Sequence, residues 1–204
     1  MIIKEIDKNL KSNKIEDFCE LPIVVYVNKF DEASAKTFQE DMSKAESTFQ
    51  DVIPIVIDSY GGSVYSLLSM IDVIKSSKKK IATICLSKAM SCGVILLSCG
   101  DQGLRFISPN STTMIHSVSS MTWGKLEDMK VDVSEADRLN NIIFSILDKN
   151  CQKNDGYFKQ IIKDKMNADW FLSASDTLYH NIANHIRLPT FKVKVSLNFS
   201  LEPE

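Results

Sequence analysis

The sequence predicts an α/β fold in which parallel strands alternate with helices. Short apolar runs at 23–27, 53–57 and 81–85 have the length and composition of buried strands. Segments 32–49 and 64–74 separate these runs and carry apolar residues at helical spacing. Strands joined by helices in this order favour parallel pairing with right-handed crossovers.

The second half of the chain adds further elements. We expect a short apolar helix over 91–99, strands at 104–107 and 112–116, and helices at 157–166 and 173–183. A long helix over about 124–150 is expected to leave the globular body. Its apolar residues are too many for one exposed helix, so we expect it to pack against another subunit through Leu139, Ile142, Ile143 and Ile146.

One main domain over 21–188 accounts for these elements. Residues 1–20 are polar and charged and are expected to form an N-terminal arm. Residues 189–204 form a C-terminal extension, in which 191–201 alternates apolar and polar residues as a strand would.

The composition excludes several classes of protein. A net charge of −2 gives no indication of nucleic-acid binding. No window is apolar over the ~20 residues that a membrane span needs, and the start has no secretory signal. The five cysteines are odd in number and follow no metal-ligand spacing. We therefore expect a cytoplasmic protein with reduced thiols and without metal or cofactor.

Three positions could carry chemistry. Ser91 opens the apolar helix 91–99, where free backbone N–H groups and the helix dipole favour negative charge. Serine is also a common N-cap, so a purely structural role is the alternative. Gly61 and Gly62 allow a sharp turn and a close approach to a ligand, or form an ordinary turn. His116 ends a strand as either a general base or a structural residue.

Four segments resemble, in order, the motifs of the ClpP peptidases, the proteolytic subunits of the ATP-dependent Clp protease. They are IDSYGGSV at 57–64, ICLSKAMSCGVILL at 84–97, PNS at 109–111 with MIH at 114–116, and DWFLSA at 169–174. The resemblance covers about residues 22–187. It implies a ClpP/crotonase-like fold of repeated ββα units, from which the helix at about 124–150 protrudes as a handle.

The same resemblance implies roles for particular residues. Ser91 would be the nucleophile, His116 the general base, and Asp169 the carboxylate that orients the imidazole. The backbone N–H groups of Gly62 and Cys92 would form an oxyanion hole. The substrate would lie along Gly61, Ser63, Ser117 and Val118.

A serine endopeptidase follows from these roles. It would hydrolyse peptide bonds without ATP itself, as the chamber subunit of an ATPase-assisted protease. Its substrates would be peptides or unfolded polypeptides. The resemblance also implies a homo-oligomer of two stacked heptameric rings and an AAA+ unfoldase partner such as ClpX or ClpA.

Other functions stay open at this point. A non-catalytic ring subunit would share the fold, although such subunits lose triad residues. A dedicated processing peptidase, for example of a viral assembly protein, would work without an ATPase. A Ser–Lys peptidase would use Lys88, three residues before Ser91. An enoyl-CoA-hydratase-like enzyme would not need this serine, histidine and aspartate.

The chain also departs from the family's pattern around the cleft. Tyr60 stands where the family usually has proline, and Met90 replaces a small residue before the serine. Ser117 and Val118 follow His116 in place of glutamine and proline. These departures predict an altered substrate cleft around an intact triad.

Overall fold

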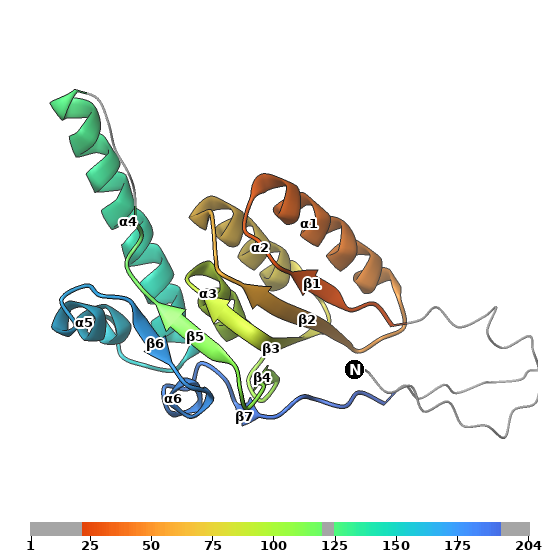
Figure 1. Ribbon diagram of the computed structural model, residues 1–204. Helices are drawn as coiled ribbons and strands as arrows, with labels where there is room; N and C mark the ends of the chain where they lie inside the picture. The colour runs from red at the N-terminus through yellow and green to blue at the C-terminus, as the bar shows by residue number, and fades with distance from the viewer. Residues whose placement is uncertain (1–21, 120–124, 193–204) are drawn as a thin grey trace, which may run out of the picture.

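A parallel sheet forms the centre of the protein (Figure 1). The computed structural model describes residues 22–119 and 125–192. Five strands follow one another across the sheet in the order β1-β2-β3-β4-β7, and every neighbouring pair is parallel. They are β1 Val25–Val27, β2 Val52–Ser59, β3 Lys80–Met90, β4 Arg105–Ile107 and β7 His185–Ile186. The predicted α/β class is confirmed.

Three helices connect the first strands and pack on the sheet: α1 Glu32–Ser47, α2 Val64–Ser76 and α3 Cys92–Ser98. Asp31 caps α1 by accepting a hydrogen bond of 2.8 Å from the N–H of Ser34, and Ser63 caps α2. The buried face of α1 carries Phe38, Met42 and Ala45, at the helical spacing seen in the sequence.

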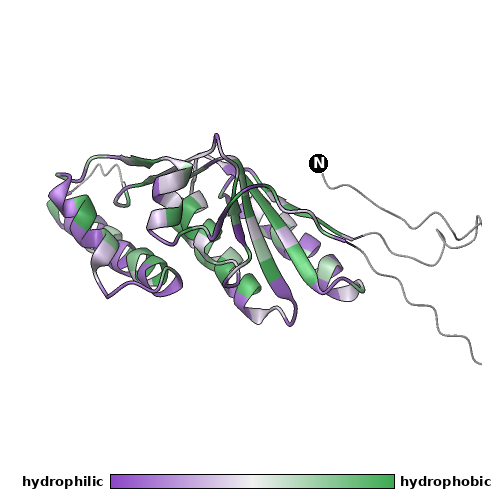
Figure 2. Cartoon of the chain, turned by 90° about the horizontal axis from the view of Figure 1, so that it is seen from below, coloured by the Kyte–Doolittle hydropathy of each residue, from purple (hydrophilic) through white to green (hydrophobic). Residues whose placement is uncertain are grey.

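The core lies between the sheet and these helices. Ile53, Ile55 and Ile57 of β2 have no exposed surface. In β3 the side chains alternate, so Ile81 joins this main core while Ile84 joins a smaller cluster on the other face. Figure 2 shows the hydrophobic residues concentrated in the strands and in the helices packed against them. This core holds the ends of β2 and β3 in place, where the candidate site lies.

Strand β3 is longer than predicted. We expected a strand over 81–85 and then a loop, but β3 continues to Met90. Its last residues, Lys88, Ala89 and Met90, pair in parallel with β5 (Thr112–Ile115). Residues 86–90 contain two exposed side chains and lack an apolar run, so their strand structure depends on pairing with β5 and, at Ala89, with Ser59 of β2.

Two short strands were not predicted. Strand β6 (Trp170–Leu172) pairs antiparallel with β5, and β7 adds two residues beside β4. The helix expected over 173–183 is shorter, because α6 spans Ala174–Tyr179. Segments of two or three residues are too short for periodicity to reveal them, and their strand geometry depends on a partner from elsewhere in the chain.

Helix α4 (Leu126–Asn150) extends from the body, as we expected for the handle helix (Figure 1). Its second half packs on the chain's own core, where Leu139 and Ile143 are buried. We expected Leu139 and Ile143 to contact another subunit. They are instead buried within the chain itself, so that expectation is wrong for these two residues. The exposed apolar residues lie instead in the first half: Leu126, Met129, Val131 and Val133.

The remaining parts complete the fold. Helix α5 (Tyr157–Asp164) packs beside α4. The predicted arm over 1–20 lies outside the described residues, as does most of the strand expected over 191–201. Of that strand, Phe191 and Lys192 are described and have no regular structure. In the part of the chain that the structure describes, no helix combines the length and apolarity of a membrane span.

Candidate active site

Ser91 lies at the sharp turn between β3 and α3. Its backbone has φ 54° and ψ −118°, a conformation that non-glycine residues rarely adopt. Its N–H donates to the carbonyl of Met114 in β5 over 2.9 Å, which ties the turn to the sheet. Although Ser91 occupies the N-cap position of α3, its side chain makes no capping hydrogen bond. The purely structural role weighed from the sequence therefore has no support.

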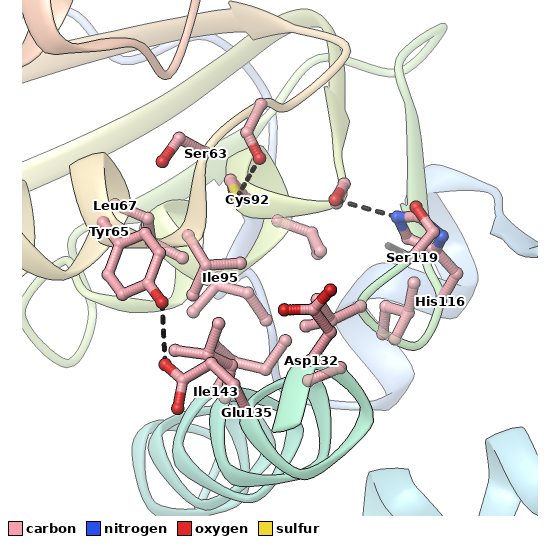
Figure 3. A pocket seen from close by; sticks show the side chains of 18 residues that line it. Ser63, Tyr65, Leu67, Cys92, Ile95, His116, Ser119, Asp132, Glu135 and Ile143 are labelled. Atoms are coloured by element: carbon pink, nitrogen blue, oxygen red, sulfur yellow. Dashed lines mark hydrogen bonds between the residues drawn. The ribbon is translucent and has the colours of Figure 1, made fainter. Parts of the chain in front are cut away.

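The Ser91 hydroxyl instead meets the imidazole of His116. The distance from Ser91 Oγ to His116 Nε2 is 2.9 Å, within hydrogen-bonding range (Figure 3). His116 follows β5, and β5 pairs with the end of β3, which Ser91 follows. The parallel register of β3 and β5 thus brings together two residues that are 25 positions apart.

Asp169 reaches the other side of the same imidazole. Strands β5 and β6 are antiparallel and pair Ile115 with Trp170, so the next residues along, His116 and Asp169, face each other. The distance from His116 Nδ1 to Asp169 Oδ1 is 3.6 Å, which suits an ion pair and is too long for a hydrogen bond. The Asp169 side chain is 55% exposed.

Two glycines follow β2, and they pack closely against Ser91 and Phe30 respectively. Gly61 has φ 107°, and a Cβ added to it would lie 2.7 Å from Cβ of Ser91. Gly62 has φ 148°, and its added Cβ would lie 2.4 Å from the carbonyl oxygen of Phe30. Any larger residue would therefore displace the backbone at both positions.

Backbone donors near the serine are available. The Cys92 thiol donates to the carbonyl of Gly62 over 3.3 Å, which joins the two segments (Figure 3). In the turns and loops of the described residues, no backbone carbonyl accepts a hydrogen bond from the N–H of Gly62 or Cys92. Backbone N–H groups without a carbonyl partner can bind a negatively charged oxygen.

A cavity of about 350 Å³ opens beside Ser91, between α2, α3 and α4. Of the residues expected to bind substrate, Ser63 and Val118 line it. Gly61 packs against Ser91 just outside the lining, and Ser117 is half-buried and outside it as well.

Helix α4 supplies one wall of this cavity, which the sequence did not predict. Its residues there share one helical face: Asp132, Glu135, Ala136, Leu139 and Ile143. Their spacing of three and four positions is the signal that could have identified this face. Asn140 of α4 also accepts a hydrogen bond of 2.7 Å from the N–H of Val118, two residues after His116.

The environment of Lys88 argues against a Ser–Lys pair. Its ammonium donates to Asp58 Oδ1 over 2.6 Å and lies 4.5 Å from the ring centre of Tyr60. The hydrogen bond to Asp58 raises the pKa of Lys88, whereas a lysine base needs a lowered pKa. Lys88 also lies within β3, where it pairs with Thr112 of β5.

Cys92 is a poor nucleophile despite its place next to Ser91. Burial raises the pKa of its thiol to about 11, so almost none is ionised near pH 7. No cluster of histidine, cysteine or acidic residues that could hold a metal ion occurs in 22–119 or 125–192.

Comparison with known proteins assigns this fold and site to a class. Residues 7–188 match the family described as Clp protease. An ATP-dependent Clp protease proteolytic subunit from Carsonella ruddii (strain PV) is 31% identical over 185 residues, which cover 89% of this chain and 93% of the relative. A protein of the same name from Deinococcus radiodurans is 32% identical over 134 residues, or 66% of this chain and 64% of the relative.

By these similarities the protein is a peptidase with a mixed α/β fold. The chain belongs to the Clp protease family, and its activity is that of a ClpP-like peptidase. A non-catalytic ring subunit, a dedicated processing peptidase and an enoyl-CoA-hydratase-like enzyme are not favoured, since both relatives are named as proteolytic subunits.

Proposed function

We propose that this chain is a serine endopeptidase with Ser91 as its nucleophile. The observation that carries the proposal is the hydrogen bond of 2.9 Å between Ser91 Oγ and His116 Nε2. A serine hydroxyl is a weak nucleophile until an adjacent base takes its proton, and His116 is the adjacent base. Lys88 and Cys92, the two rivals, are respectively paired with Asp58 and kept protonated by burial.

The chemistry then follows the order of proton transfers. As Ser91 Oγ attacks the peptide carbonyl carbon, its proton passes to His116 Nε2. The imidazolium returns that proton to the leaving amine when the C–N bond breaks, which leaves an acyl group on Ser91. A water molecule, deprotonated by the same imidazole, hydrolyses this ester and restores the hydroxyl.

Asp169 is the orienting carboxylate in this proposal. It faces His116 Nδ1 through the pairing of β5 and β6 and would stabilise the imidazolium. Catalysis requires the distance of 3.6 Å to shorten to about 3 Å, so that a hydrogen bond forms. Catalytic hydrogen bonds commonly tighten in this way when substrate binds.

The oxyanion would be bound by the backbone N–H groups of Gly62 and Cys92. Both residues line the cavity beside Ser91, and in the described turns and loops neither N–H donates to a backbone carbonyl. Donors of this kind stabilise the charge that develops on the carbonyl oxygen and typically contribute ~10²–10³ in rate.

We also propose an assembly and partners. Both relatives are named subunits of an ATP-dependent Clp protease. For this chain we propose peptides and unfolded polypeptides as substrates, an AAA+ unfoldase as partner, and a cytoplasmic homo-oligomer of two stacked heptameric rings. The exposed apolar residues in the first half of α4 are available for contact between subunits.

Labelling with a fluorophosphonate followed by peptide mapping tests the nucleophile. We expect the label on Ser91, and we expect Ser91→Ala to abolish both labelling and peptide hydrolysis. Cys92→Ala should keep most of the activity. Activity that survives Ser91→Ala and disappears in Cys92→Ala would contradict the proposal.

A further inference from the structure

The cavity beside Ser91 combines an apolar floor with an acidic wall. Leu67 of α2, Ile95 of α3 and Ile143 of α4 line it with aliphatic side chains. Asp132 and Glu135 line it from α4. Figure 3 shows the Asp132 carboxylate directed from α4 into the space between Ile95 and His116.

The two acidic residues differ in whether other side chains form hydrogen bonds or ion pairs with their carboxylates. Arg138 donates two hydrogen bonds of 2.7 Å to the Glu135 carboxylate, and the Tyr65 hydroxyl donates a third of 2.7 Å. These bonds, first from Arg138 and then from Tyr65, lower the pKa of Glu135 to about 2. Glu135 is therefore ionised and already paired.

Asp132 has no such partner. Among the described residues, no side chain forms a hydrogen bond or an ion pair with its carboxylate. The nearest basic residues along α4 are engaged elsewhere, since Lys130 pairs with Glu127 and Arg138 pairs with Glu135. Its negative charge is therefore available to a ligand in the cavity.

The position of the cavity relates it to one residue of the substrate. Ser91, Gly62 and Cys92 all line it, and in the proposed mechanism these residues surround the carbonyl group under attack. The side chain nearest the cavity is then the one on the residue that supplies this carbonyl, called P1. A cavity of about 350 Å³ accommodates a long side chain.

We propose that Asp132 makes this peptidase prefer lysine or arginine at P1. The aliphatic part of such a side chain would cover the apolar floor, and its charged end would pair with Asp132. A leucine at P1 would remove water from the carboxylate without replacing its hydrogen bonds, and a glutamate would be repelled. This inference rests on the proposed function, which it extends to the substrate class.

Matched fluorogenic peptides that differ only at P1 test the preference. Lysine and norleucine have the same straight chain and differ in charge, so their ratio isolates the electrostatic contribution. The lysine peptide is expected to have a kcat/KM about two- to fivefold higher at low salt, the range of an exposed ion pair. High salt should reduce the ratio, because it screens the pair.

Variants assign the preference to one carboxylate. Asp132→Asn should bring the ratio of kcat/KM between the lysine and norleucine peptides close to one, by lowering the lysine value. Asp132→Glu should retain the preference. Asp137→Asn is the matched control, because it removes the same charge from an exposed position of α4 outside the cavity lining.

Equilibrium binding of the same peptides to Ser91→Ala separates this inference from the proposed hydrolysis. Fluorescence anisotropy should show that Ser91→Ala binds the lysine peptide more tightly than the norleucine peptide. The double variant Ser91→Ala with Asp132→Asn should bind the two peptides equally. A binding preference without turnover by the wild-type protein would support the cavity's specificity and contradict the hydrolysis. Turnover that depends on Ser91 but shows no lysine preference in rate or binding would overturn the inference and leave the hydrolysis standing.

Discussion

Ser91 adopts a rare backbone conformation, and its neighbours make that conformation possible. Its φ of 54° costs on the order of 1–3 kcal/mol for a residue with a side chain. The hydrogen bond to Met114 and the close packing of Gly61 hold the turn in place. The result is a hydroxyl that points away from the helix it precedes and toward His116.

Gly61→Ala tests whether close packing positions Ser91. The new Cβ would lie 2.7 Å from Cβ of Ser91, so the serine must shift and kcat/KM should fall by about tenfold or more. Gly103→Ala is the control, because Gly103 also has a positive φ but no atom within 4 Å of an added Cβ. Gly103→Ala should lose about 1 kcal/mol of unfolding free energy from backbone strain, and Gly61→Ala should lose more because of the overlap with Ser91. Equal activity in the two variants would show that the contact with Ser91 is unimportant.

The Cys92 thiol should resist alkylation in the folded protein. Its pKa of about 11 lies above the usual value of 9.0, because burial disfavours the thiolate. The thiolate fraction, and with it the rate of modification by iodoacetamide, should rise about tenfold per pH unit from pH 8 to pH 10. Mass spectrometry would follow modification of Cys92, with the urea-unfolded protein as the reactive control. Rapid native labelling at pH 7 would mean that the thiol is ionised or exposed.

Among the elements, α4 both lines the cavity and holds the segment that follows His116. Its Leu139 and Ile143 face the core and the cavity together, and Asn140 binds the N–H of Val118. The segment that follows His116 is therefore attached to α4 and not only to β5. A displacement of α4 would reach the imidazole through this hydrogen bond.

Asn140→Ala should separate positioning from substrate affinity. Without its partner, the Val118 N–H loses a hydrogen bond worth about 1 kcal/mol, and His116 is held less well. We expect kcat to fall about three- to tenfold while KM stays nearly constant. The matched control is Asn141→Ala, since Asn141 binds only the exposed Lys159 among described side chains. A similar loss in both variants would indicate a general effect on α4.

At the scale of the whole molecule, the first half of α4 is too apolar for a surface that stays in water. Leu126, Val131 and Val133 are each more than half exposed on a helix that leaves the body (Figure 1). Leu126 and Val133 are seven positions apart and therefore share one face of the helix. Exposed apolar residues on one face commonly mark contacts between proteins. The proposed ring assembly would cover them with another copy of α4.

Val133→Asp should therefore shift the protein to smaller assemblies and lower its peptidase activity. A carboxylate at a contact that excludes water costs several kcal/mol unless it is paired. Light scattering coupled to size-exclusion chromatography would measure the mass. Ser145→Asp is the control, because it adds the same charge at an exposed position of α4 nearer the body.

The outcome for Val133→Asp shows whether peptidase activity depends on contacts between subunits. Small assemblies with full activity would mean that the Ser91–His116 pair works within each subunit without ring contacts. A charge at Ile143 could not test the subunit contact in the same way. Ile143 is buried in the chain's own core, so Ile143→Asp would unfold the subunit.

The sequence by itself determined the order of the main strands and helices and the candidate catalytic residues. Apolar runs and helical spacing report local burial, so β1, β2 and α1 could be predicted from their own residues. Ser91, His116 and Asp169 were found because each lies in a motif of a known family. The tertiary structure then placed Ser91 and His116 in hydrogen-bonding contact.

Only the tertiary structure decided which of these residues meet, and at what distance. The pairing of β5 with β6 sets Asp169 opposite His116, and β6 has too few residues to be seen in the sequence. The partner of Lys88 and the acidic wall from α4 depend on contacts between segments that are distant in the chain. Hydrophobic patterns record whether a residue is buried but not which residue it touches, because burial is a local property of one element and contact is a property of two.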